Sequence, residues 1–177
     1  MYELSTASAW RRFPVTDLFD IERGQRLTKK DMIAGDVPFV SSSKYENGIS
    51  HYIKPPKDAE IFNAGTITIS MKGSILALYH DQRYCASESV AVLKPKPEVD
   101  LRKEQLIFIA SILTVMIKDR GFYDSLNLEK VKCLSIPLPV YDGGDLDFGL
   151  MIEYTRKLQS LSDAEVNKYF YEIGWVL

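Results

Sequence analysis

Apolar residues in the first two thirds of the chain occur in short runs separated by glycine, asparagine, proline or Lys-Gly. The runs are rich in β-branched and aromatic residues and predict strands at residues 15–21, 37–41, 49–53, 66–71, 75–79 and 89–93. Asn47-Gly48 suits a tight hairpin turn, and Lys72-Gly73 divides two alternating apolar runs in the same way. We therefore expect a body made of short strands and hairpins.

The apolar spacing changes to that of a helix near residue 100. Apolar residues then recur on one side over residues 100–118, which predicts a core helix that Asp100 caps and Gly121 ends. Residues 132–138 predict one more strand, which Pro137 and Pro139 stop.

From residue 145 onward the spacing predicts an amphipathic helix, and Ser162-Asp163-Ala164-Glu165 is a capping-box pattern that predicts a second short helix. The two helices would form an α-hairpin. The apolar residues of the first helix are the expected partner interface, because exposed apolar area marks interfaces; they are Met151, Tyr154, Leu158 and Leu161. The alternative is that they complete the core of the chain itself.

Together these elements predict an α+β fold: an irregular β-rich body with one core helix over residues 1–140, and a C-terminal α-hairpin over residues 141–177. Both parts are expected to form one structural unit, because no repeat or long linker divides them. A chain of 177 residues buries roughly 70% of its unfolded surface, so it needs no disulfide or metal to fold.

Composition narrows the class of protein further. Cys85 and Cys133 fall in strand-like stretches without metal-ligand spacing and are expected to be buried thiols. Residues 1–10 do not resemble a signal peptide, and the longest apolar stretch, residues 106–117, is too short to span a membrane. We expect a cytoplasmic protein that has no membrane segment.

The net charge is −2, with 22 basic and 24 acidic residues. The acidic excess comes from residues 141–177, which hold 3 basic and 7 acidic residues. Residues 23–84 hold 9 basic and 6 acidic residues together with both histidines. This weak asymmetry permits a nucleic-acid-binding face in the body without requiring one.

Motifs for catalysis are missing from the sequence. His51 and His80 have no partner at helical spacing, and glycine-rich phosphate loops and a nucleophile elbow are absent. Ser41-Ser42-Ser43 lacks an evident base. We therefore expect no catalytic centre, no metal site and no cofactor.

The loops between the predicted strands carry basic and hydrogen-bonding side chains instead. Arginine and lysine can contact guanine or phosphate, asparagine and glutamine can pair with adenine, and hydroxyls can bond to either. The candidate DNA-binding residues are Arg23, Gln25, Arg26, Lys29, Lys30, Ser42, Ser43, Lys44, Tyr45, Asn47, Lys72, Ser74 and Arg83.

Several blocks of the chain resemble a known family in their order and approximate spacing. They lie at residues 10–24, 35–41, 47–53, 65–73, 125–132 and 136–139. The first reads Trp-Arg-Arg-Phe-Pro-Val-Thr-Asp-Leu-Phe-Asp-Ile-Glu-Arg-Gly, and the last is Ile-Pro-Leu-Pro. This set is similar to the target-recognition domains of type I restriction-modification specificity subunits. The stretch after Ile-Pro-Leu-Pro is closer to BcgI-like specificity proteins.

The resemblance implies a non-catalytic module whose β-rich body recognises double-stranded DNA and whose helices dock partner subunits. The implied partners are a methyltransferase subunit and an endonuclease or translocase subunit. A complete specificity subunit has two recognition domains, and this chain has room for one. We therefore expect either half of such a subunit, a fragment of one, or a chain that pairs with itself or with a second recognition domain.

Two other classes of protein stay open. A hydrolase or nuclease that uses the serine loop with His51 would require a base within hydrogen-bond reach of a serine. A protein-interaction module would bind partners through its helical tail and leave DNA untouched. A contiguous positive groove formed by the loops would argue against the latter.

Overall fold

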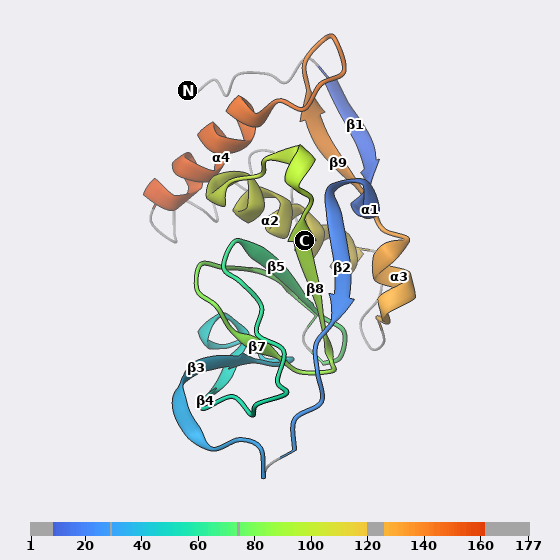
Figure 1. Cartoon of the computed structure of the whole chain (residues 1–177). Coiled ribbons are helices and arrows are strands. Elements are labelled where there is room, and N and C mark those ends of the chain that lie inside the picture. Colours follow the sequence, from blue (N-terminus) through green and yellow to red (C-terminus); the bar gives the residue numbers. More distant parts are fainter. Residues whose placement is uncertain (1–8, 29, 74, 120–125, 162–177) are drawn as a thin grey trace.

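Figure 1 shows the computed structural model, which describes residues 9–28, 30–73, 75–119 and 126–161. The chain forms three antiparallel or mixed sheets, and one long helix packs against the central one. The strands are β1 (Ala9–Pro14), β2 (Phe19–Arg23), β3 (Ala34–Val40), β4 (Ile49–Ile53), β5 (Thr66–Ser70), β6 (Ala77–His80), β7 (Cys85–Ala86), β8 (Val90–Pro95) and β9 (Ser135–Val140). The helices are α1 (Val15–Leu18), α2 (Lys103–Asp119), α3 (Leu128–Lys132) and α4 (Phe148–Ser160), and 3-10 turns lie at Glu46–Gly48 and Pro97–Val99.

A four-stranded antiparallel sheet in the order β2-β8-β5-β6 is the centre of the body. Its strand β8 is apolar at consecutive positions because both of its faces are buried. Ala91 and Leu93 face the main core, whereas Val90 and Val92 belong to a second, smaller core. The predicted α+β class is confirmed.

The second sheet has the order β4-β3-β7 and covers the face of the central sheet that lies away from α2. β3 pairs antiparallel with β4 and parallel with β7. The hairpin predicted around Asn47-Gly48 is therefore present, but its connection is longer than a tight two-residue turn. It spans residues 41–48, because pairing ends at Val40 and resumes at Ile49.

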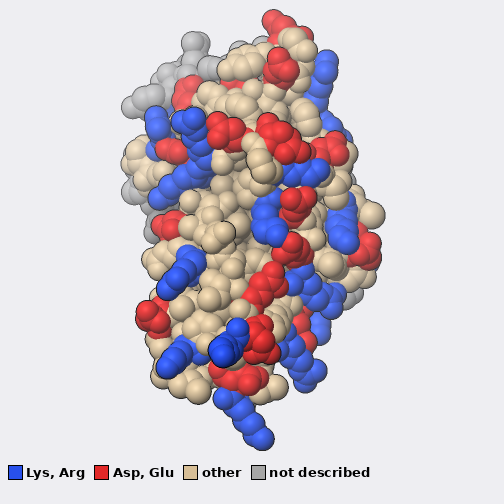
Figure 2. All heavy atoms as spheres, viewed as in Figure 1, with Lys and Arg blue, Asp and Glu red and all other residues tan. Residues whose placement is uncertain are grey.

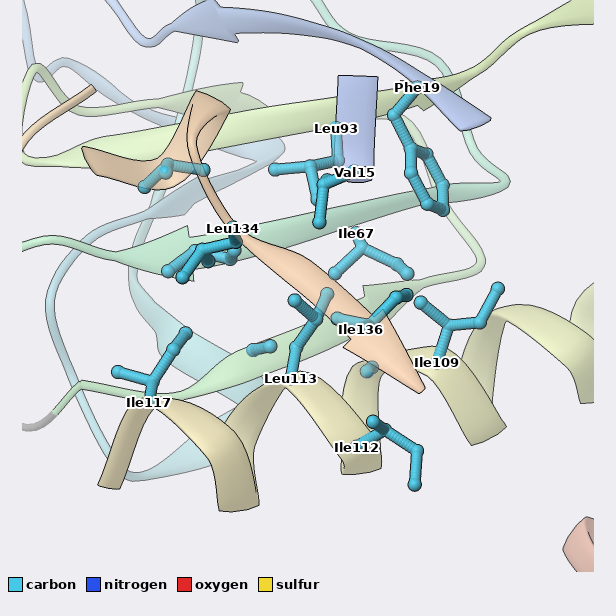
Figure 3. Packing of buried hydrophobic residues seen from close by; sticks show 14 of the residues in the cluster. Val15, Phe19, Ile67, Leu93, Ile109, Ile112, Leu113, Ile117, Leu134 and Ile136 are labelled. Atoms are coloured by element: carbon cyan, nitrogen blue, oxygen red, sulfur yellow. The ribbon is translucent and has the colours of Figure 1, made fainter. Parts of the chain in front are cut away.

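Helix α2 supplies one wall of the main core. Figure 3 shows Ile109, Leu113 and Ile117 pointing from this helix toward the strands, where Ile67 and Leu93 lie. The predicted core helix is thus confirmed. Its expected cap is wrong, however, because Asp100 has a left-handed backbone with φ of 45°.

The start of α2 is capped by a different side chain. Gln105 Oε1 accepts a hydrogen bond of 2.7 Å from the backbone N–H of Arg102, which satisfies one of the free donors at the helix start. The expected end at Gly121 lies outside the described residues.

Two strand predictions need correction. Residues 15–21 begin with the short helix α1, because Val15 and Leu18, three positions apart, both turn into the core. The strand predicted at residues 132–138 begins later, at Ser135, because Lys132 is the last residue of α3. Asn127 caps this helix by accepting a hydrogen bond of 2.8 Å from the Lys130 N–H. The strand after it, β9, pairs with β1, a strand that the apolar pattern did not predict.

The tail begins with the predicted helix, α4, which Asp147 caps at the Leu150 N–H. This helix packs against α2: Thr155 donates to the Glu104 carbonyl at 2.9 Å, and Tyr154 meets the Phe108 ring edge-on. Met151 is fully buried in the main core. The second helix of the predicted α-hairpin falls in residues 162–177 and lies outside the described residues.

The two cysteines differ in burial. Cys85 is buried as expected, and burial raises the pKa of its thiol. Cys133 is exposed, so the prediction of a buried thiol is wrong there, since α3 places it at a helix end rather than in a strand. None of the helices in the described part of the chain has the length and apolarity that a bilayer crossing requires.

Candidate nucleic-acid interface

The turn between β7 and β8, residues 87–89, is where the ends of both large sheets meet; we name it the junction turn. Its Ser87 N–H donates to the Val40 carbonyl at 2.9 Å, and its Ser89 carbonyl accepts from the Met71 N–H at 2.8 Å. The Gly24 N–H donates to the Val90 carbonyl just beyond it, at 3.0 Å. The segments that follow β2, β3 and β5 therefore leave their strands beside this turn.

Gly24 fixes the segment after β2 against this turn. A Cβ added there would lie 2.4 Å from the Ser87 carbonyl oxygen and 2.5 Å from that of Ala86. Both contacts are with backbone atoms, which cannot rotate away as a side chain can. Glycine is therefore required for the close approach, which sets the positions of Arg23 and Gln25 on either side.

Three serine hydroxyls join two of the segments. Ser42 donates to the Ser89 hydroxyl at 3.0 Å, and the Ser87 and Ser89 hydroxyls lie 2.7 Å apart. Ser43 shapes its own loop, because its hydroxyl accepts from the Tyr45 N–H at 3.2 Å. Both serines were predicted as DNA contacts, and the structure gives both hydroxyls internal partners.

The two amides predicted to pair with adenine are also bonded within the chain. Gln25 Nε2 donates to the Asp58 carbonyl at 3.2 Å, and its Oε1 accepts from the Glu60 N–H at 2.8 Å. Asn47 Nδ2 donates to the Tyr79 carbonyl at 2.9 Å. Gln25 thus acts as a bridge between two loops.

Replacing Gln25 with alanine should lower the free energy of unfolding by about 1 to 2 kcal/mol, because two hydrogen bonds of about 1 kcal/mol each are lost. Urea denaturation measures this change, and hydrogen exchange at the Glu60 amide should accelerate. Gln82→Ala is the matched control, since Gln82 is exposed on the loop after β6. Equal stability of the two variants would contradict the bridging role.

The loop of residues 41–48 holds an exposed aromatic side chain in a bent backbone. Glu46, Asn47 and Gly48 all have positive φ, at 48°, 53° and 80°. Tyr45 is 69% exposed, and the Lys44 ammonium lies 5.1 Å from the centre of its ring. Positive φ is uncommon outside glycine, so the loop conformation depends on its tethers to Ser89 and Tyr79.

The basic residues predicted to contact DNA do not all gather at the junction turn. Arg23, Arg26 and Lys72 are exposed on the segments beside it. Lys30 precedes β3, so it lies toward the end of that strand that is opposite to the junction turn. Arg83 follows β6, whose His80 pairs with Thr66 at the far end of the central sheet. Lys29 and Ser74 lie outside the described residues.

Charge on the visible face is mixed. Figure 2 shows basic and acidic side chains interspersed over this face rather than a continuous positive patch. The ion pair of Arg26 Nε with Glu88 Oε1, at 3.9 Å, is one example beside the junction turn. Sequence reasoning missed Ser87, Glu88 and Ser89. Their position between two apolar runs marks only a turn, and their role depends on contacts from distant segments.

The histidines have structural surroundings. His80 Nε2 lies 2.8 Å from the Thr68 hydroxyl, its ring packs against Tyr84, and burial lowers its pKa to about 4. His51 Nδ1 lies 3.1 Å from its neighbour Ser50, whose hydroxyl donates to the Phe39 carbonyl. Within the part of the chain that the structure describes, neither histidine is hydrogen-bonded to a serine of residues 41–43, a contact that a hydrolase using the serine loop with His51 would require. Among the described residues, no cluster of three potential ligands could hold a metal ion.

Comparisons with known proteins agree with this architecture. The S subunit of a type I restriction-modification system from M. genitalium has a TM-score of 0.67 at 15% identity; the match covers 89% of this chain and 40% of that one. The HsdS subunit from Thermoanaerobacter tengcongensis has a TM-score of 0.63 at 15% identity, over 97% of this chain and 41% of that one. At these identities the likeness establishes the fold.

A sequence relative adds to the fold match. The specificity subunit of the type II restriction enzyme BcgI from Heyndrickxia coagulans is 26% identical over 153 residues, which cover 86% of this chain and 44% of the relative. The chain therefore spans less than half the length of that subunit. The family model described as "Type I restriction modification DNA specificity domain" matches residues 7–159. Because this match covers most of its length, the chain belongs to the family of type I restriction-modification DNA specificity domains.

Proposed function

We propose that the chain is a DNA target-recognition module that reads one part of a DNA sequence through the loops around the junction turn. The observation that carries the proposal is the meeting of the segments after β2, β3 and β5 at the junction turn. A DNA face needs exposed basic groups on a fixed backbone, and Arg23, Arg26 and Lys72 meet this description. Family membership supports the same reading.

Chemistry on the DNA would belong to other chains. A methyltransferase subunit and an endonuclease or translocase subunit are the partners that we propose, with this chain contributing no catalytic group. A bipartite site would arise if the chain pairs with a second copy or with a second recognition domain. The tail over residues 141–177 would provide the docking surface. Leu158 and Leu161 are half-buried and suit this role better than Met151, which is buried.

Binding to duplex DNA should weaken with salt, because each neutralised phosphate releases counterions and adds about −0.9 to the log-log slope. Fluorescence anisotropy with a pool of random duplexes measures this slope. Arg23→Ala and Lys72→Ala should each reduce its magnitude by about 1 if the side chains contact phosphates. Lys103→Ala is the control, since Lys103 begins α2 beyond the opposite end of β8.

A second outcome would favour another function. If the purified chain shows no DNA binding at low salt while it still binds a methyltransferase subunit, the protein-interaction reading replaces the present proposal.

If the chain binds DNA, selection of bound sequences from the same random pool tests sequence recognition directly. A recovered consensus supports sequence reading, whereas recovery without any preference would leave only phosphate binding.

A further inference from the structure

Glu88 is the central residue of the junction turn and is exposed. Its neighbours Ser87 and Ser89 are half-buried and bonded to each other through their hydroxyls. The backbone on both sides is also held, because the Val90 N–H donates to the Ser87 carbonyl at 3.0 Å and the Ser89 carbonyl accepts from Met71. Glu88 therefore projects from a fixed position at the centre of the proposed DNA face.

A carboxylate at this place is unfavourable for phosphate binding. It repels the polyanion that Arg23, Arg26 and Lys72 would attract. Its contact with Arg26 is long, at 3.9 Å, and both side chains are largely in solvent, with exposures of 48% for Glu88 and 76% for Arg26. Exposed ion pairs of this kind add little stability. Neither affinity for phosphate nor folding accounts for an acid at the centre of the face.

The chemistry of base edges supplies a suitable partner. An ionised carboxylate only accepts hydrogen bonds, so it needs a donor. In the major groove guanine and thymine present acceptors, whereas cytosine presents its N4 amino group as a donor. Adenine offers a donor beside an acceptor, an arrangement that suits an amide rather than a carboxylate.

We propose that Glu88 accepts a hydrogen bond from the N4 amino group of a cytosine, and that Arg26 contacts the guanine paired with it. This inference rests on the proposed function. Guanine O6 and N7 are the usual partners of arginine, and they lie beside cytosine N4 on the same edge of the base pair. Arg26 and Glu88 lie next to each other, so the arginine can meet the two guanine acceptors while the glutamate meets the cytosine donor.

The test is selection of bound duplexes from a random pool with the full chain and its Glu88→Gln and Arg26→Gln variants. The wild-type consensus is expected to contain one C·G pair that each variant selects less strongly, because each variant loses one of the two proposed contacts. Changing this pair to T·A should weaken wild-type binding roughly fivefold to tenfold, the low end of base discrimination. It should weaken Glu88→Gln binding by a smaller factor, because that variant keeps only the Arg26 contact with guanine, and a Glu88→Gln/Arg26→Gln double variant should bind both duplexes almost equally. Glu98→Gln is the matched control, because Glu98 is exposed in the 3-10 turn beyond the opposite end of β8.

Three results separate this inference from the proposed function. A wild-type chain that binds no duplex DNA overturns both. A Glu88→Gln variant that keeps the full strength of the wild-type preference for the C·G pair, or that binds all sequences more tightly by the same factor, overturns the base contact alone. Thermal unfolding verifies that the variants are folded. Glu88→Asp, which keeps the charge but shortens the reach, should also weaken the C·G preference.

Discussion

Met151→Ala should lower the free energy of unfolding by about 3 kcal/mol, because deletion of a buried methionine side chain loses its transfer energy and leaves a cavity. Met151 is 0% exposed and belongs to the main core, although it lies on the tail helix α4. Urea denaturation of the full chain measures the change. The large effect would show that the first half of the tail belongs to the fold of the body.

Leu158→Asp is the matched variant on the last turn of the same helix. Leu158 is half-buried rather than buried, so the variant is expected to stay folded and to lose self-association or methyltransferase docking. Analytical ultracentrifugation and pull-down with the methyltransferase subunit report these losses. If Leu158→Asp unfolds the chain as strongly as Met151→Ala destabilises it, α4 completes the core over its whole length and the docking surface lies elsewhere.

Lowering the pH from 7 to 5 should remove about 2 kcal/mol from the free energy of unfolding, as calculated from a His80 pKa of about 4 in the folded chain and 6.5 in the unfolded one. Burial is the main cause of the shift, and the nearby Asp81 opposes it. Because the folded pKa is depressed, the stabilising effect of neutral His80 is complete above pH 6.5. It is lost as the pH falls toward 4, since the unfolded chain takes up a proton that the folded chain excludes.

Urea denaturation at several pH values isolates this effect. The His80→Gln variant should lose the part of the pH dependence between 6.5 and 4 that His80 causes, while other groups continue to titrate. His51→Gln should retain the wild-type dependence, because His51 is exposed on β4. A His80→Gln variant with the full wild-type pH dependence would show that His80 is not the group responsible.

Local patterns in the sequence were sufficient for much of the fold. Strand β4 has the predicted bounds, and α2 and α4 lie where apolar spacing places them, because their burial follows a regular period. Strand β1 escaped detection because its residues are mostly exposed and its partner, β9, is far along the chain. Helix α1 was taken for a strand because four residues are too short to establish a helical period.

By itself, the sequence determined the α+β class, the main strands and helices, and the family, since these depend on periodicity and on ordered blocks. Tertiary structure alone decided which polar side chains are bonded within the chain. Gln25 bonds to Asp58 and Ser42 to Ser89 across separations of 33 and 47 residues, and no local pattern encodes such partners. Long-range backbone bonds of the turn with Val40 and Met71 likewise fix the place of Glu88 in the structure, because the turn is held only where the ends of two sheets meet.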